Sequence, residues 1–169
     1  TGGFGLLGIN LVNFLLKKKY KIIILDYKKT TSKKKFFIKS KKLIFENANF
    51  VNMDNLNKIF NKHSFSAVFH LGAQTQVKTA YNNPYETLQT NVVGTINILE
   101  ILRKKNIDIP IVYSSSDKAY GELKRKYYYE TDNLNAIFPY DVSKSASDLI
   151  CQSYSKTYNM KIGIIRSAN

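Results

Sequence analysis

Short apolar runs alternate with longer amphipathic stretches along the whole chain of 169 residues. Strand-length runs lie at 21–26, 50–54, 66–71, 109–114 and 162–165, and helical periodicity marks 6–19, 55–62, 84–105 and 139–158. On the first helix, Leu7, Leu11, Phe14 and Leu15 form the expected apolar stripe. Strands separated by helices pair in parallel, because each helix carries the chain back across the sheet. The sequence therefore predicts an α/β fold with a doubly wound parallel sheet.

Three glycines, Gly2, Gly5 and Gly8, stand at the entrance of the first predicted helix. Glycine permits a tight turn, close approach of the backbone to a pyrophosphate, and close packing of helix on strand. The helix N-terminus offers free N–H groups to the phosphates. Asp26 ends the next strand, where a carboxylate can accept hydrogen bonds from ribose hydroxyls. The pattern indicates a Rossmann-like dinucleotide site, although a glycine turn that binds nothing is the structural alternative.

The residues around Asp26 favour one dinucleotide over the other. A carboxylate at this position would repel a 2′-phosphate, which favours NAD. Lys28 and Lys29 follow closely and keep NADP open. We expect NAD.

Tyr140 and Lys144 share one face of the helix at 139–158, because they are four residues apart. A nearby ammonium lowers the pKa of a phenol, which can then act as a general base. Tyr120 and Lys124 have the same spacing but lie in a Gly-containing loop. Only the first pair opens a long helix and follows a polar cluster, 114–117, at a strand's carboxyl end, where open α/β sheets bind ligands.

Together these motifs resemble the extended short-chain dehydrogenase/reductases, in the NAD-dependent nucleotide-sugar epimerase/dehydratase branch. They stand in one order and cover essentially the whole chain: Thr1-Gly2-Gly3-Phe4-Gly5-Leu6-Leu7-Gly8, His70-Leu71-Gly72-Ala73-Gln74, Thr90-Asn91-Val92-Val93-Gly94-Thr95, Ser115-Ser116-Asp117-Lys118-Ala119-Tyr120-Gly121 and Pro139-Tyr140-Asp141-Val142-Ser143-Lys144. Phe4 and Gly72 are minor variants within them.

The resemblance implies roles for the matching residues. Ser116 would hydrogen-bond the sugar 4-hydroxyl, Tyr140 would remove its proton, and Lys144 would hold the nicotinamide ribose and tune Tyr140. NAD would oxidise C4 to a ketone and later take part in reduction, so that it is recycled. Asp54 would contact the adenine, and 70–74 would line the cleft. The cofactor-binding residues expected are Gly2, Phe4, Gly5, Leu6, Gly8, Asp26, Asp54, Leu71, Ala73, Gln74, Asn91, Tyr140 and Lys144.

Asp117 and Lys118 bear on the reaction that follows C4 oxidation. A 4,6-dehydratase must protonate the departing C6 oxygen, and dehydratases of this branch carry an acid directly after the serine, here Asp117. The dTDP-glucose enzymes have Asp-Glu here, with Glu as the C5 base, whereas Asp-Lys resembles the CDP-glucose 4,6-dehydratases. Tyr120-Gly121 is more typical of the wider branch. We expect a 4,6-dehydratase, which is a lyase. Its catalytic residues would be Ser116, Asp117, Lys118, Tyr140 and Lys144. The two alternatives are a 4-epimerase of the same branch, which would be an isomerase, and a non-catalytic NAD-binding module.

The net charge is +14, and twelve lysines lie between Lys17 and Lys42. A basic chain can bind nucleic acid or an acidic membrane, but no nucleic-acid motif and no membrane-spanning stretch occurs. We expect solvated lysines in a loop, with neither partner. A single cysteine, Cys151, and two histidines predict a buried, reduced thiol, no metal site and a cytoplasmic compartment.

Both ends of the sequence look cut, because no strand feeds the glycine turn and the last predicted strand runs to the end. We expect 1–169 to be one NAD-binding domain that lacks its first strand and the C-terminal substrate domain of the branch. The first strand lies at the centre of the order 3-2-1-4-5-6, so the fragment alone should be unstable and inactive. By resemblance, the two long helices would form a homodimer contact in the full-length protein.

Overall fold

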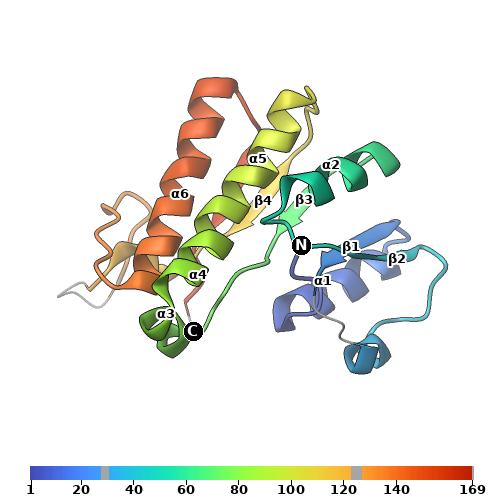
Figure 1. Ribbon diagram of the computed structural model, residues 1–169, viewed down its shortest axis with the longest axis horizontal. Coiled ribbons are helices and arrows are strands. Elements are labelled where there is room, and N and C mark those ends of the chain that lie inside the picture. The colour runs from blue at the N-terminus through green and yellow to red at the C-terminus, as the bar shows by residue number, and fades with distance from the viewer. Residues whose placement is uncertain (28–30, 123–126, 169) are drawn as a thin grey trace.

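The computed structural model describes residues 1–27, 31–122 and 127–168, and its strands form two parallel sheets. In the first sheet, β1 (Ile22–Asp26) pairs with β2 (Leu43–Asn47) from Ile22 opposite Leu43 to Asp26 opposite Asn47. The second has the order β3 (Val68–His70), β4 (Ile111–Ser114) and β5 (Ile162–Ile165). The parallel pairing confirms the predicted α/β class (Figure 1).

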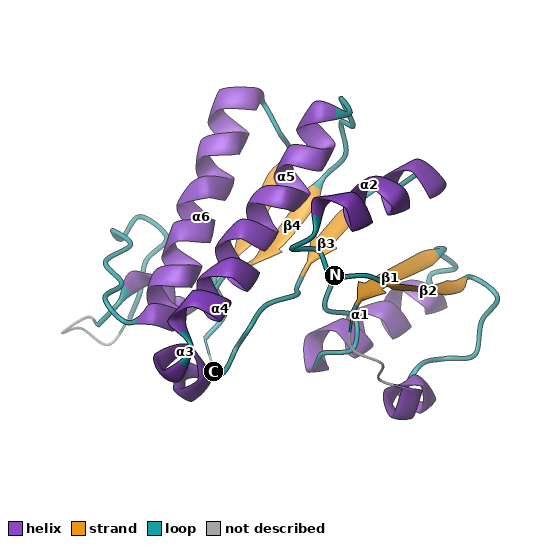
Figure 2. Cartoon of the chain, viewed as in Figure 1, coloured by secondary structure: helices purple, strands orange, loops and turns teal. Residues whose placement is uncertain are grey.

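Figure 2 shows helices packed along the strands. The α-helices are α1 (Leu6–Lys17), α2 (Met53–Lys62), α3 (Val77–Asn82), α4 (Pro84–Leu88), α5 (Gly94–Lys104) and α6 (Pro139–Tyr158). A π-helical segment, η2 (Gln89–Val93), joins α4 to α5 with right-handed helical backbone on both sides. The predicted helix at 84–105 is therefore continuous but widened in its middle. Helices α2, α5 and α6 pack side by side and bury the side chains of the main core against β3 and β4.

The strand expected at 50–54 is wrong, because the second strand of the first sheet is Leu43–Asn47. Residues 49–52 form a turn in which the backbone N–H of Val51 donates to the side chain of Asn49. The side chain of Asn52 then accepts a hydrogen bond from the backbone N–H of Asn55 and caps α2. Phe50 is the buried side chain of this turn, and its apolar character explains why the sequence pattern resembled a strand.

The apolar stripe expected on α1 is also shifted. Leu7 and Phe14 are more than half exposed, whereas Gly8, Val12 and Leu16 face the core. Val12 and Leu16 pack in a small cluster with Phe4, Ile24 and Phe37. The chain contains apolar residues on two faces of α1, and only the contact with β1 decides which face is buried.

An open apolar groove of ≈ 640 Å³ lies between β1 and β3. Its walls include Ile23 and Leu25 from β1, Val68 and Phe69 from β3, and Leu11 from α1. The backbone nitrogen of Thr1 donates to the carbonyl of Phe69, and the carbonyl of Thr1 accepts from Leu71, so that the chain starts alongside β3. The groove therefore separates the edge of β1 from the edge of β3, which belong to different sheets.

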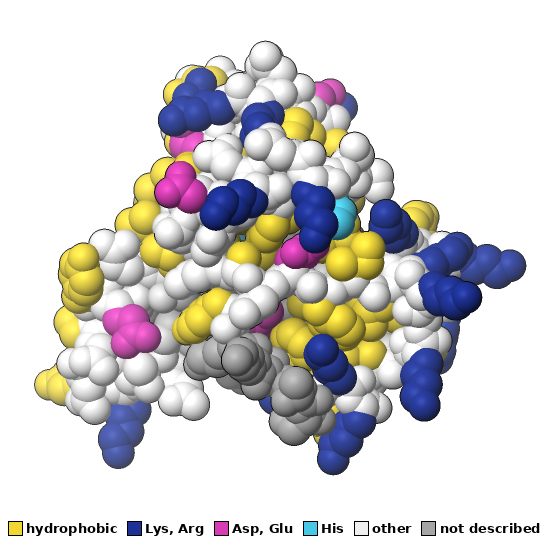
Figure 3. Space-filling view, turned by 45° about the vertical axis from the view of Figure 1, so that its right-hand side comes forward, with side chains coloured by type: hydrophobic (Ala, Val, Ile, Leu, Met, Phe, Trp, Pro, Cys, Tyr) yellow, Lys and Arg dark blue, Asp and Glu magenta, His cyan; other side chains and the backbone are white. Residues whose placement is uncertain are grey.

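The lysine-rich stretch is more ordered than the loop expected there, because it contains a 3₁₀ helix, η1 (Thr31–Phe36), and leads into β2. Lys33, Lys34, Lys35, Lys39, Lys41 and Lys42 are exposed. Figure 3 shows Lys and Arg side chains gathered on this side of the molecule. Lys28 and Lys29 lie outside the described residues. Within the described part of the chain, no helix is long and apolar enough to cross a membrane.

Candidate dinucleotide and sugar site

The glycine-rich turn folds tightly between β3 and α1. Gly2 has a φ of 68° and lies so close to β3 that an added Cβ would stand 2.6 Å from the backbone nitrogen of Gly72. The carbonyl of Gly2 accepts from the N–H of Gly5 at 3.0 Å. A Cβ on Gly8 would overlap the carbonyl oxygen of Gly2. The first turn of α1 therefore packs directly on the glycine turn, and a helix N-terminus in such a position can bind phosphate through its free N–H groups.

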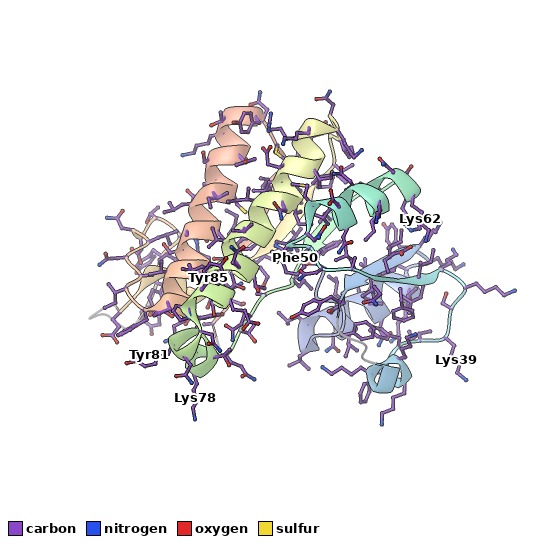
Figure 4. All side chains as sticks on the ribbon, in the orientation of Figure 1. Lys39, Phe50, Lys62, Lys78, Tyr81 and Tyr85 are labelled. Carbon is purple, nitrogen blue, oxygen red and sulfur yellow. The ribbon has the colours of Figure 1, made fainter. Side chains whose placement is uncertain are left out.

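A buried histidine ties this turn to the rest of the sheet. The Nδ1 of His70 lies 2.7 Å from the hydroxyl of Thr1, and its Nε2 lies 3.1 Å from the hydroxyl of Thr95. The same Thr1 hydroxyl accepts from the N–H of Gly72. Burial holds the pKa of His70 well below its ordinary value. Phe50, labelled in Figure 4, packs edge-on against the neutral imidazole at 5.2 Å.

Asn91 connects the residues that follow β3 to α6. Its Oδ1 accepts from the backbone N–H of Gln74 at 2.7 Å, and its Nδ2 donates to the carbonyl of Gln74 and to the hydroxyl of Ser143. The side chain is buried and lies in the π-helical segment η2. Such segments often occur at functional sites because they displace a side chain from the regular helical position. Asn91 thus sets the backbone path of the residues that follow β3.

Ser116 stands at the carboxyl end of β4, where the chain turns into the 3₁₀ helix η3 (Asp117–Tyr120). Its hydroxyl donates to the carboxylate of Asp117 at 2.9 Å and accepts from the backbone N–H of Lys118. Ser116 is 8% exposed, Asp117 is half-buried and Lys118 is exposed. A serine hydroxyl and a carboxylate are therefore paired at the sheet edge.

Tyr140 and Lys144 lie in the first two turns of α6, as predicted, and both are buried. The amine of Lys144 donates to the carbonyl of Ser114 at 2.6 Å and lies over the ring of Tyr113. Burial lowers the pKa of Lys144 to about 8. Since Ser114 ends β4 and Ser116 follows it, the helix face of Tyr140 and Lys144 meets residues 114–116, the serine segment.

The pKa of the Tyr140 phenol is raised above its ordinary value, whereas the sequence analysis expected Lys144 to lower it. Burial is the main cause; the neighbouring Ser116 hydroxyl opposes it, and the carboxylates of Asp141 and Asp117 reinforce it. The amine of Lys144 is engaged with Ser114. The i, i+4 spacing thus brought the two residues onto one face but did not by itself create an activated phenol.

The remaining predicted cofactor-binding residues lie at the carboxyl ends of strands, with the exception of Asp54. Asp26 ends β1 and is half-buried, and Leu71, Ala73 and Gln74 follow β3. Asp54 does not end a strand; it is exposed in the first turn of α2. Lys124 lies outside the described residues.

The sequence analysis did not identify three polar residues that shape the site: Ser143, Asp148 and Arg166. Asp148 lies one turn beyond Lys144 and is fully buried, with its carboxylate held by Arg166. Ser143 links α6 to Asn91. The repeat of Tyr140, Lys144 and Asp148 at four-residue intervals could have revealed Asp148, but nothing local identifies its partner.

A family profile described as "GDP-mannose 4,6 dehydratase" matches residues 1–169. The chain is 34% identical to a putative UDP-glucose 4-epimerase from Methanocaldococcus jannaschii, over 100% of this chain and 54% of the relative. Among solved structures, it resembles UDP-glucose 4-epimerase from Thermotoga maritima, crystallised with UDP-glucose, with a TM-score of 0.88 and 26% identity over 99% of this chain and 54% of that one.

A dTDP-glucose 4,6-dehydratase from Bacillus anthracis, solved in complex with NAD, has a TM-score of 0.86 and 28% identity over 99% of this chain and 53% of that one. The likeness confirms the Rossmann-like fold. The chain spans about half the length of the relatives that it matches.

Proposed function

Because this chain belongs to the GDP-mannose 4,6 dehydratase family, within the nucleotide-sugar epimerases and dehydratases of the extended short-chain dehydrogenase/reductases, we propose that the full-length protein is an NAD-dependent nucleotide-sugar 4,6-dehydratase. The observation that carries the choice of reaction is the carboxylate of Asp117, held 2.9 Å from the hydroxyl of Ser116 at the end of β4.

The glycine turn fits a dinucleotide. Gly2 has a backbone conformation that favours glycine, and the packing of Gly8 leaves no room for a side chain beside the N-terminus of α1. Asp26 ends β1, where it would accept hydrogen bonds from the adenosine ribose. Residues 70–74 would line the dinucleotide cleft, and Asp54 would contact the adenine. Bound NAD would supply the oxidation of C4 and the later reduction.

The residues at the end of β4 and the start of α6 would handle the protons. Ser116 would hold the sugar 4-hydroxyl, and Tyr140 would remove its proton as C4 is oxidised. Lys144 would hold the nicotinamide ribose. Its amine donates to the carbonyl of Ser114 and lies over the ring of Tyr113. The resulting 4-ketone would acidify the C5 proton, and Lys118 stands at the position of the glutamate that serves as the C5 base in the dTDP-glucose enzymes.

Asp117 separates the two candidate reactions. Loss of water across C5 and C6 needs an acid at the departing C6 oxygen, and Asp117 lies beside the serine that would hold the neighbouring part of the sugar. A 4-epimerase needs no such acid, because the ketone is reduced from its other face. The 4-epimerase remains the second candidate, favoured by the 34% identity to a putative UDP-glucose 4-epimerase.

The deciding experiment incubates the full-length protein with NAD and a panel of nucleotide-glucose substrates. A base-dependent absorbance of a 4-keto-6-deoxy sugar with one substrate supports the dehydratase and identifies the nucleotide. Asp117→Asn should then abolish the signal, whereas the control Asp108→Asn, which alters an exposed ion pair with Lys161, should keep it. A C4 epimer without any keto sugar would contradict the dehydratase and assign the epimerase.

We also propose a homodimer for the full-length protein. Tyr81 and Tyr85, on α3 and α4, are each 75% exposed, and Leu149 on α6 is 51% exposed. Figure 4 labels the two tyrosines at these helices. Sedimentation of the full-length protein as a monomer would contradict this. One NAD-binding domain at 1–169 and a cytoplasmic location stay predictions.

A further inference from the structure

Arg166 and Asp148 form a buried ion pair behind the serine segment. Arg166 follows β5, and its Nε and Nη2 donate to the two carboxylate oxygens of Asp148 on α6 at 2.8 and 2.9 Å. The side chain of Asp148 is fully buried and that of Arg166 is 16% exposed. Gln152 donates a further hydrogen bond to the same carboxylate. Two parallel bonds fix the plane of the guanidinium as well as its position.

The third nitrogen of this guanidinium points toward the segment that follows β4. Its Nη1 donates to the phenol oxygen of Tyr120 at 2.8 Å and to the carbonyl of Glu130 at 3.1 Å. The guanidinium also lies over the ring of Tyr120, 5.0 Å from its centroid, and Tyr128 stacks on the same ring. Arg166 therefore joins β5, α6, η3 and the chain at 128–130.

The contacts of Arg166 and its neighbour hold both ends of η3. At the first end, the backbone N–H of Asp117 donates to the carbonyl of Ser167 at 3.1 Å, and the N–H of Ser115 donates to Ile165. At the last end, the phenol of Tyr120 is held by Arg166. Ser116 and Asp117 stand between these points, so their direction depends on how firmly η3 is fixed.

We propose that Arg166, oriented by Asp148, is a positioning residue for the substrate-binding serine and acid, Ser116 and Asp117. The inference rests on the proposed function of that site and goes beyond it, because neither residue touches the reacting atoms. A displacement of about 1 Å in a reacting group can lower a rate by about a hundredfold. Loosening η3 should therefore lower kcat without removing the cofactor.

The test compares Arg166→Lys and Tyr120→Phe in the full-length protein. A lysine can keep the charge opposite Asp148, but its single ammonium cannot hold the two carboxylate oxygens and Tyr120 in one plane. Tyr120→Phe keeps the ring under the guanidinium and removes only the oxygen that accepts from Arg166. The expected result is a loss of about tenfold or more in kcat, with an unchanged dissociation constant for NAD.

The chain contains a matched control pair. Arg103 donates to both oxygens of Glu100 at 2.6 and 2.9 Å and lies over the ring of Tyr158 at 5.0 Å, but it is on α5, away from Ser116. Arg103→Lys should leave kcat unchanged. If Arg166→Lys fails to fold, Asp148→Leu/Arg166→Met replaces the buried pair by apolar side chains, which proteins often accept. This double variant should fold and show the same loss of kcat.

Amide hydrogen exchange supplies a readout that needs no substrate. The N–H groups of Asp117, Ala119 and Gly121 are hydrogen-bonded in and around η3, and they should exchange faster in Arg166→Lys than in Arg103→Lys. Wild-type kcat in Arg166→Lys and Tyr120→Phe, or an equal loss in Arg103→Lys, would overturn the inference. If the wild type converts no nucleotide sugar, the proposed function fails, and equal exchange in the two arginine variants then overturns the positioning role separately.

Discussion

The amine of Lys144 donates a 2.6 Å hydrogen bond to the backbone carbonyl of Ser114. It thereby joins α6 to the end of β4, which the chain reaches 30 residues earlier. The charged amine is buried and lies against the ring of Tyr113, so the protein places a cation inside its core at the edge where the substrate is proposed to bind. Burying a charge costs free energy unless polar partners offset it.

The buried amine predicts a pH dependence of stability. Its pKa is about 8 in the folded protein against 10.5 for an ordinary lysine, so the unfolded chain binds more protons between these values. The free energy of unfolding should therefore rise with pH from 8 to 10.5, by up to about 1.4 kcal/mol per pH unit from this group. Urea unfolding of the full-length protein and of Lys144→Met checks this. The wild type should gain stability relative to the variant over that range, and a constant difference between them would contradict the prediction.

Asn91→Ala should weaken both stability and NAD binding. It removes the hydrogen bonds that hold the backbone of Gln74 and the hydroxyl of Ser143, at a cost of about 1–3 kcal/mol. Asn97→Ala is the matched control, because Asn97 is also buried on the same helical rod and donates to Val51. Calorimetric titration with NAD should show weaker binding only for the Asn91 variant. Equal affinities in the two variants would mean that Asn91 has no part in shaping the cofactor site.

Gly8→Ala tests the packing of α1 on the glycine turn. The new methyl group would overlap the carbonyl of Gly2 and stand 2.7 Å from Cα of Gly3, which should destabilise the protein by about 1–3 kcal/mol and remove NAD binding. At Gly163 an added Cβ would meet only the carbonyl of Ile111, at 3.9 Å. Thermal unfolding and NAD titration should therefore distinguish Gly8→Ala from a nearly neutral Gly163→Ala. Normal NAD affinity in the Gly8 variant would exclude close contact between NAD and the backbone of this turn.

Residues 1–169 produced alone should aggregate or unfold. The facing edges of β1 and β3 are separated by the apolar groove, and an unpaired strand edge is a template for association with other chains. Sedimentation together with binding of a hydrophobic dye measures this directly. A monomeric chain with a cooperative unfolding transition would show that the two sheets are stable without a strand between them.

Prediction from the sequence succeeded where the signal is local. The helix at 139–158 and the strand at 162–165 have the predicted bounds, because proline, periodicity and β-branched residues mark them. It failed at 50–54, where a single buried Phe50 in an Asn-rich turn imitated a strand. The sequence analysis also missed α3 and chose the wrong face of α1. Short helices, and helices with apolar residues on two faces, give ambiguous periodicity.

The sequence by itself determined the parallel α/β class, the glycine turn before α1, and the common helix face of Tyr140 and Lys144, since these depend on residues close together in the chain. Only the tertiary structure decided that Lys144 meets Ser114, that Asn91 meets Gln74 and Ser143, and that Arg166 reaches both Asp148 and Tyr120. The physical reason is that buried polar groups must find partners. Which partners are within reach depends on how helices and strands far apart in the sequence pack together.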